Sequence, residues 1–288
     1  MRLDDERMSD NVERRSGGGG MRKIGIGGGI GGVIIIVLAL LFKQDPQQVM
    51  QAVQQVQGPG GGEESVSQVT KENASAIEIF SSKILASTED VWKQEFERLQ
   101  LNYEKPKMVL FTDATTSGCG AAESAMGPFY CPADARVYLD VSFFNELEQR
   151  FGVKGEFARA YVIAHEVGHH VQNLLGISRK VQSMRGRLSE TEYNKLSVKL
   201  ELQADFLAGL WANHAEKTRN IIVPGDIQSG LNAASAVGDD KLQEAGTGRV
   251  VPDAFTHGTS EQRMFWFKKG YETGDFRQGD TGIGLGGR

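Results

Sequence analysis

The residues with the clearest chemical potential lie in one short run of the chain. His165, Glu166 and His169 form an H-E-x-x-H pattern. Residues four apart share a helical face, so both imidazoles can bind one ion, and Glu166 can reach a water on that ion. With 5 histidines among 288 residues, about 0.007 such matches are expected by chance. The pattern therefore predicts a catalytic metal site, with zinc as the ion that this motif usually holds.

A catalytic zinc site needs a third protein ligand, which leaves a fourth position open for water. The extended form of the motif would need a histidine at position 175, where this chain has Leu175. A later segment offers Glu201 and Asp205, which also share one helical face. We expect Glu201 to be the ligand and Asp205 to accept a hydrogen bond from the non-ligating nitrogen of His165. Two imidazoles and a carboxylate also suit divalent ions other than zinc.

Peptide hydrolysis requires groups that move protons and stabilise developing charge. Zinc would activate a water, and Glu166 would act as the general base. A further donor must stabilise the oxyanion that forms at the scissile carbonyl. His257 is the candidate catalytic residue for this task, because it lies in a loop just before an expected helix. Tyr130 and Tyr138 are the alternatives.

The elements that must position these residues are mostly helices. Apolar spacing predicts helices over 67–85, 89–101, 142–150, 157–175, 191–217, 227–237 and 260–273. Alternating apolar residues predict strands over 108–112 and 136–144. Early strands and late helices indicate an α+β fold with a small sheet. We expect a substrate peptide to pair with an exposed strand edge over 137–141.

A span without charge precedes these elements. Residues 24–42 are nineteen consecutive positions without a charged side chain, which reach roughly 28 Å as a helix, close to the thickness of a bilayer's hydrocarbon core. A buried core helix should show polar positions over this length, and a signal peptide should end in a small-residue cleavage site. The segment has neither polar positions nor such a cleavage site. This predicts an uncleaved transmembrane helix, with the lipid bilayer as a partner. Basic residues are concentrated before the span, which places residues 1–23 in the cytoplasm and the catalytic domain in the periplasm or outside the cell.

Composition divides the remaining chain. Residues 43–65 read as a linker, 66–272 as the globular domain, and 273–288 as a disordered Gly-rich tail. An oxidising compartment would let Cys119 and Cys131 close a disulfide. The net charge is -5, with 32 Lys and Arg against 37 Asp and Glu. No basic surplus is available to neutralise phosphates, which argues against a nucleic-acid partner.

Several segments together resemble one known family. They are similar to the bacterial family described as "putative neutral zinc metallopeptidase" at N-V-E-R-R (11–15), S-G-C-G (117–120), G-P-F-Y-C-P (127–132), V-Y-L-D (137–140), the two metal segments, and F-T-H-G-T-S-E-Q-R (255–263). The resemblance implies a membrane-anchored, zincin-like fold of the gluzincin kind. It also implies His165, His169 and Glu201 as zinc ligands and Glu166 as catalytic base. The chain departs from the family at Phe206, where members often have a cysteine; no role is assigned to that position.

The residues and the resemblance favour a membrane-anchored zinc metallopeptidase that hydrolyses peptide or protein substrates. One alternative is a non-catalytic binding or scaffold domain that contains zinc. Retention of Glu166 argues against that alternative, because a purely structural zinc site usually has four protein ligands and needs no general base. Another alternative is a zinc amidase that acts on cell-wall peptides, which the same ligands would serve.

Overall fold

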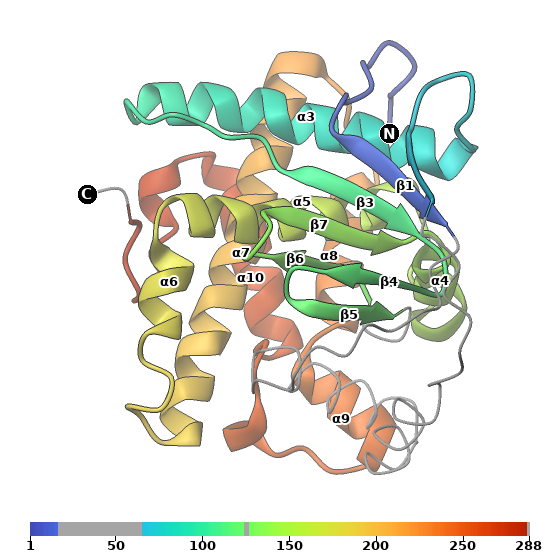
Figure 1. Ribbon diagram of the computed structural model, residues 1–288. Helices are drawn as coiled ribbons and strands as arrows, with labels where there is room; N and C mark the ends of the chain where they lie inside the picture. The colour runs from blue at the N-terminus through green and yellow to red at the C-terminus, as the bar shows by residue number, and fades with distance from the viewer. Residues whose placement is uncertain (17–64, 124–126, 287–288) are drawn as a thin grey trace.

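A five-stranded sheet forms one layer of the molecule, and helices α5, α7, α8 and α10 lie behind it (Figure 1). The computed structural model describes residues 1–16, 65–123 and 127–286. The strand order is β2-β1-β3-β7-β6. The three central strands run parallel, and the outer two are antiparallel to their neighbours. The strands are β1 (Val12–Ser16), β2 (Ser65–Gln68), β3 (Lys107–Phe111), β6 (Phe129–Cys131) and β7 (Arg136–Asp140).

The two faces of this sheet carry different apolar cores. Met108 and Leu110 of β3 belong to the large core shared with the helices. Val109 and Phe111 alternate with them and pack with Ala122 on the opposite face. This alternation follows from the pleat, which sends successive side chains to opposite faces. A separate hairpin supplies Ala122; it consists of β4 (Ala114–Ser117) and β5 (Gly120–Glu123).

The α+β expectation is confirmed, with helices dominating the second half of the chain. The two helices predicted over 67–85 and 89–101 form one continuous helix, which begins only at Ala76. Residues 67 and 68 belong instead to β2. The helices are α3 (Ala76–Arg98), α4 (Phe143–Phe151), α5 (Glu156–Leu174), α6 (Ile177–Gln182), α7 (Glu190–Arg219), α8 (Asp226–Ala236), α9 (Asp239–Thr247) and α10 (Ser260–Thr273), with short 3-10 turns η2 (Pro252–Ala254) and η3 (Phe276–Gln278).

Helix α10 lies tightly along α7 because two glycines remove side chains from the contact. A Cβ on Gly209 would lie 2.0 Å from the Phe267 carbonyl oxygen, and one on Gly270 would lie 2.1 Å from that of Phe206. No larger residue fits at these distances without separating the helices. The close approach brings residues of α10 beside the middle of α7, where the predicted metal ligand Glu201 lies.

Residues 1–16 belong to the folded domain, which overturns the predicted topology. Strand β1 lies between β2 and β3 and is hydrogen-bonded to both. Arg14 of β1 also donates to Glu78 of α3 at 2.5 and 2.8 Å. A single membrane crossing between residues 16 and 65 would separate two strands that are neighbours in one sheet. The predicted single-pass arrangement, with a cytoplasmic N-terminus and a catalytic domain in the periplasm or outside the cell, is therefore wrong.

The membrane prediction receives no support from the remaining helices. In the three ranges that the structure describes, no helix combines the length and the apolar character needed to cross a bilayer. The predicted transmembrane helix over 24–42 lies outside those ranges, as does the predicted linker up to residue 64. The local run of apolar residues suggested an anchor, whereas the pairing of β1 with β2 depends on contacts that no local pattern reveals.

The C-terminal segment differs from the disordered tail expected over 273–288. Residues 274–286 pack against α6 and α7 beside the C-terminal end of α5, at the left of Figure 1. The Asp280 side chain accepts hydrogen bonds from the N–H groups of Gly282, Ile283 and Gly284 at 2.8 to 3.1 Å. Gly282 and Gly284 have φ angles of 91° and 86°, which glycine adopts without strain. The glycines that suggest disorder by composition instead allow a tight turn.

The strand edge predicted for substrate pairing over 137–141 is also wrong. Strand β7 is hydrogen-bonded to β3 on one side and to β6 on the other. Its residues Val137, Tyr138 and Leu139 are almost completely buried. Among the described strands of this sheet, β6 is the outer one on the side of α5.

Candidate metal centre

Two crossing helices bring the predicted ligands together. Helix α5 carries His165 and His169, and α7 carries Glu201. The helices approach closely where Gly168 faces Ala204, since a Cβ on Gly168 would lie 3.1 Å from the Ala204 carbonyl oxygen. A side chain at position 168 would require the helix backbones to move apart by a few tenths of an ångström at the point where they carry the histidines and the carboxylate.

The ligand atoms converge on one point. His165 Nε2 lies 3.2 Å from Glu201 Oε2, and His169 Nε2 lies 3.5 Å from Glu201 Oε1. One ligand atom from each residue can be chosen so that all three lie within 4.8 Å of one another. A tetrahedral zinc site with bonds of about 2.0–2.2 Å has ligand-to-ligand distances of roughly 3.3–3.6 Å. The donor set fits a zinc ion with three protein ligands, and the two nitrogen-to-oxygen distances are close to this spacing.

The carboxylate of Glu201 is ionised in this arrangement. Burial alone would raise the pKa of Glu201, but the nearby imidazoles of His169 and His165 outweigh burial and hold its pKa well below the usual value. An ionised carboxylate between two imidazoles has the charge that a divalent cation requires.

Asp205 lies behind His165, on the side of the ring away from Glu201. His165 Nδ1 lies 2.9 Å from Asp205 Oδ1. The Asp205 carboxylate accepts two further bonds from Arg263, at 2.8 and 3.0 Å, and one from the Tyr161 hydroxyl at 2.5 Å. Burial raises the pKa of Asp205, but Arg263 and His165 outweigh it, so the pKa lies below the usual value. An ionised acceptor holds a proton of His165 on Nδ1, so Nε2, which faces Glu201, is the nitrogen that can bind a metal.

Arg263 and Tyr161 are the site residues that the sequence interpretation missed. Arg263 is almost fully buried and comes from α10, and its guanidinium lies 3.4 Å from His165 Nδ1. Its only sequence signal is that a buried arginine needs a carboxylate partner, and sequence does not show burial at that position. Tyr161 lies one turn before His165 on α5, so its shared helical face could have suggested a role.

Glu166 is buried beside the ligands. Burial raises the pKa of Glu166, and the negative charge of Glu201 adds to this effect. The two imidazoles and a hydrogen bond from the backbone of Tyr130 act in the opposite direction, yet the pKa stays above its usual value. A carboxylate with a raised pKa accepts a proton more readily near neutral pH, which suits a general base.

His257, the predicted oxyanion donor, lies close enough to Glu201 for the two charges to interact. Its Nδ1 is 3.1 Å from Asp239 Oδ1, and its own backbone N–H donates to Asp239 Oδ2 at 2.6 Å. Burial lowers the pKa of His257, but Asp239 and Glu201 outweigh burial and raise it. Asp239 therefore fixes the ring and favours a protonated imidazole, with Nε2 left to donate a hydrogen bond.

The two tyrosines considered as alternatives are engaged elsewhere. The Tyr138 hydroxyl donates to Asp134 at 2.7 Å. The Tyr130 hydroxyl lies 3.0 Å from His170 Nδ1 and accepts a bond from Asn173. Burial lowers the pKa of His170 to about 4, so its ring is neutral. These contacts leave His257 as the stronger candidate.

A disulfide links the two cysteines of the chain near this centre. Cys119 follows β4, and Cys131 is the last residue of β6. The bond ties the β4–β5 hairpin to the strand whose neighbouring residue, Tyr130, contacts Glu166. The disulfide therefore braces one wall of the site.

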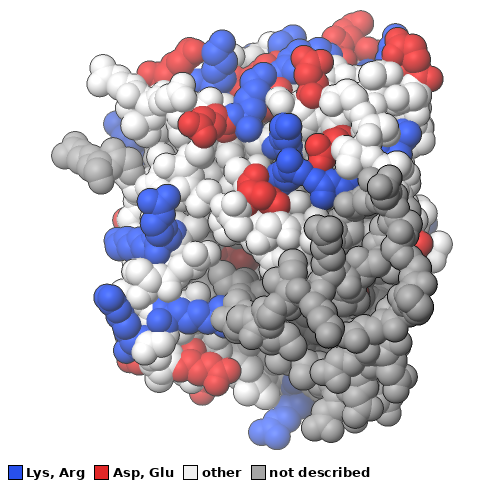
Figure 2. Space-filling view, in the orientation of Figure 1, with Lys and Arg blue, Asp and Glu red and all other residues white. Residues whose placement is uncertain are grey.

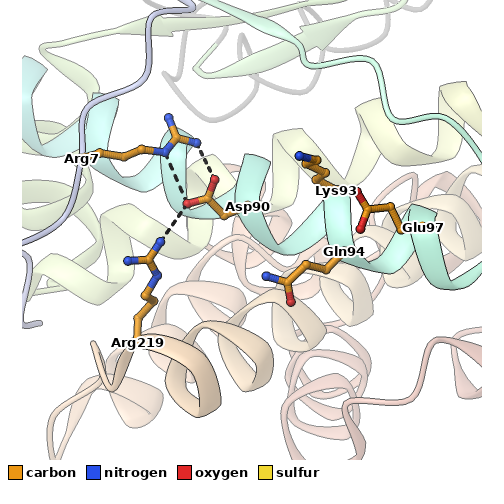
Figure 3. A pocket seen from close by; sticks show the side chains of 6 residues that line it. All are labelled: Arg7, Asp90, Lys93, Gln94, Glu97 and Arg219. Atoms are coloured by element: carbon orange, nitrogen blue, oxygen red, sulfur yellow. Dashed lines mark hydrogen bonds and ion pairs between the residues drawn. The ribbon is translucent and has the colours of Figure 1, made fainter.

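A surface pocket against α3 is separate from the metal centre. It is lined by Arg7, Asp90, Lys93, Gln94, Glu97 and Arg219 (Figure 3). Asp90 accepts bonds from Arg7 at 2.6 Å and from Arg219 at 3.3 Å. Figure 2 likewise shows charges of both signs side by side over α3 and the first strands. Asp90 is thus paired with two of the three basic side chains that line the pocket.

Two imidazoles and an ionised carboxylate lie close together with a buried glutamate beside them, which is the donor set of a candidate mononuclear metal site. Comparison with known proteins agrees with this class. The family model described as "Putative neutral zinc metallopeptidase" matches residues 1–282, and the chain belongs to this family.

Relatives extend over most of the chain. The chain is 46% identical over 289 residues to the uncharacterized protein YpfJ of Escherichia coli K12, covering 98% of each. It is 45% identical over 206 residues to the uncharacterized protein Rv2575 of Mycobacterium tuberculosis H37Rv, covering 68% of this chain and 67% of that one. No solved structure matches the chain.

Proposed function

We propose that this protein is a zinc-dependent peptidase. The observation that supports the proposal most directly is the convergence of His165, His169 and Glu201, with ligand atoms within 4.8 Å of one another. A buried general-base candidate, Glu166, lies beside them. A purely structural zinc site would need a fourth protein ligand and no base, so this arrangement favours catalysis over a scaffold role.

The residues divide the work of peptide hydrolysis among them. Zinc, when bound, lowers the pKa of water and polarises a carbonyl group. Glu166 accepts the proton of the attacking water and returns it to the departing amine. His257, oriented by Asp239, donates a hydrogen bond to the oxyanion. His165 and His169 keep their proton on Nδ1 and so present Nε2 to the site.

The substrate is an extended peptide that pairs with β6. This strand is one of the two outer strands of the described sheet, and the Tyr130 backbone contacts the base Glu166. Main-chain pairing gives affinity with little sequence selectivity. The disulfide at Cys131 braces the strand, so its reduction should raise KM for peptides. Unchanged KM after verified reduction would argue against β6 as the binding edge.

Substitution of the base provides the central test. Glu166→Gln removes the proton acceptor and keeps the shape of the side chain. Hydrolysis of casein or of a mixed peptide library should fall by about 10²–10⁴-fold, while zinc content measured by metal analysis stays at one ion per chain. Glu190→Gln, on the exposed first turn of α7, is the matched control and should retain activity. Equal rates for Glu166→Gln and the parent would rule out the assignment.

A second test examines the oxyanion donor. His257→Gln should lower kcat by about 10²–10³-fold and change KM little, because the donor acts on charge that forms only in the transition state. Asp239→Asn should have a smaller effect in the same direction, since it only orients the ring. An effect of His257→Gln confined to KM would place His257 in substrate binding instead.

A further inference from the structure

We infer that the C-terminal segment 274–286 is a positioning element of the metal centre, acting on His169 through Gln203 and Gln172. The inference rests on the proposed metal site. It adds a part of the chain that no motif connects with that site.

A hydrogen-bond relay connects His169, through Gln172 and Gln203, with the backbone of the C-terminal segment. It begins at Nδ1 of His169, the ring nitrogen that does not face Glu201. This nitrogen lies 2.9 Å from Gln172 Oε1. The Gln172 side chain is fully buried, so water does not compete for this contact. Gln172 therefore occupies the same place behind His169 that Asp205 occupies behind His165.

The next step is the amide nitrogen of Gln172. It donates to the Leu200 carbonyl oxygen at 2.7 Å and to Gln203 Oε1 at 3.1 Å. Gln203 is 1% exposed. Its own amide nitrogen donates to the carbonyl oxygens of Gly279 and Gly284, at 2.9 and 3.1 Å. The relay thus ends on the backbone of the C-terminal segment.

The direction of every bond in this relay follows from its ends. A backbone carbonyl can only accept, so Gln203 must present its NH₂ group to Gly279 and Gly284. Its oxygen then faces Gln172, which must present NH₂ to Gln203 and oxygen to His169. A proton of His169 therefore lies on Nδ1, and Nε2, which faces Glu201, is the nitrogen that can bind a metal.

Other contacts of the C-terminal segment hold the Gly279 and Gly284 carbonyl groups in place. Thr281 donates to the Lys199 carbonyl oxygen at 2.6 Å, and Lys180 donates to the Ile283 carbonyl oxygen at 3.0 Å. A Cβ on Gly279 would lie 2.7 Å from the ring of Phe206, which is fully buried. The segment therefore fits only in a narrow range of positions.

Coupling of this kind is reciprocal. If docking of the segment favours the metal-binding form of His169, metal binding must favour docking of the segment by the same factor. Loss of a group that orients a metal-binding histidine typically lowers metal affinity about 10–100-fold.

The test uses the full chain and reads zinc affinity by competition with a chelator, with circular dichroism of the metal-free form as the check on folding. Gly279→Ala displaces the segment against Phe206 and should weaken zinc binding about tenfold. Arg277→Ala, two residues away with a side chain 85% exposed, is the matched control and should leave affinity unchanged. Gln172→Leu should weaken binding about 10–100-fold.

The combined variants distinguish the relay from general destabilisation. Gly279→Ala should cause no further loss of affinity in a Gln172→Leu background. The inference is overturned if Gly279→Ala lowers only the melting temperature, or if its effect on affinity is the same in both backgrounds. Absence of peptide hydrolysis by a zinc-binding parent would contradict the proposed function alone.

Discussion

The two histidines of the metal centre are held by opposite kinds of partner. Behind His165 lies the charged pair of Asp205 and Arg263. Behind His169 lie two neutral glutamines, which end on the backbone of residues 279 and 284. Both arrangements leave the Nε2 atoms free for the metal.

The difference teaches how a tautomer can be fixed with or without charge. The charged arm, formed by Asp205 and Arg263, relies on an ionised acceptor. Burial of these two ions is favourable only while both are present. The neutral arm, formed by Gln172 and Gln203, relies on the direction of the two side-chain amides. The backbone carbonyls of residues 279 and 284 determine that direction. Loss of one partner should therefore be more harmful on the charged arm.

The largest expected effect comes from Asp205→Asn. The amide cannot neutralise Arg263, which would remain as a buried charge without its anion. Loss of one partner from such a pair costs about 3–5 kcal/mol of unfolding free energy. Urea denaturation of the metal-free protein measures this loss of unfolding free energy. Addition of Arg263→Met should restore much of the loss, and a double variant as unstable as Asp205→Asn would show that charge is not the cause.

Metal removal should have the next largest effect. Zinc at 100 times its Kd stabilises a folded protein by about 2.7 kcal/mol, and a chelator should abolish this gain in thermal unfolding. The gain at a fixed zinc concentration should shrink in both Asp205→Asn and Gln172→Leu, because each arm holds one ligand. A gain that shrinks in only one variant would show that the other arm does not serve metal binding.

Gln203→Leu probes the neutral arm with a smaller effect. It leaves the Gly279 and Gly284 carbonyls without their donor, and an unsatisfied buried group costs about 1–3 kcal/mol. The unfolding free energy of the metal-free protein should fall by that amount, less than for Asp205→Asn. A loss equal to that of Asp205→Asn would remove the distinction between the arms.

The smallest expected effect is on how the stability of the protein depends on pH in acid. The pKa of Asp205 is lowered in the fold because Arg263 and His165 outweigh burial. A carboxyl group with a lowered pKa contributes stability above its unfolded pKa of about 3.9, and this contribution is lost as pH falls through the folded value. Stability measured below about pH 4 should therefore decline less steeply in Asp205→Asn. Gln203→Leu should keep the decline of the parent, and a shallower curve there would contradict the assignment.

Much of the site could be predicted because it depends on one helix at a time. The spacing of His165 and His169, and that of Glu201 and Asp205, places each pair on one face by helical geometry alone. The order of early strands and late helices could also be predicted, because the spacing of apolar residues is a local signal. The predicted topology across the membrane failed, because a run of apolar residues is a local signal and the pairing of β1 with β2 is not.

The sequence by itself determined which candidate groups can meet, namely two imidazoles and two carboxylates at spacings that a regular helix makes adjacent. Only the tertiary structure decided what holds them. Arg263 and the carbonyls of residues 279 and 284 reach the centre through the packing of α10 and the C-terminal segment against α7. Such contacts depend on how surfaces far apart in the chain fit together, and side-chain periodicity contains no information about that fit.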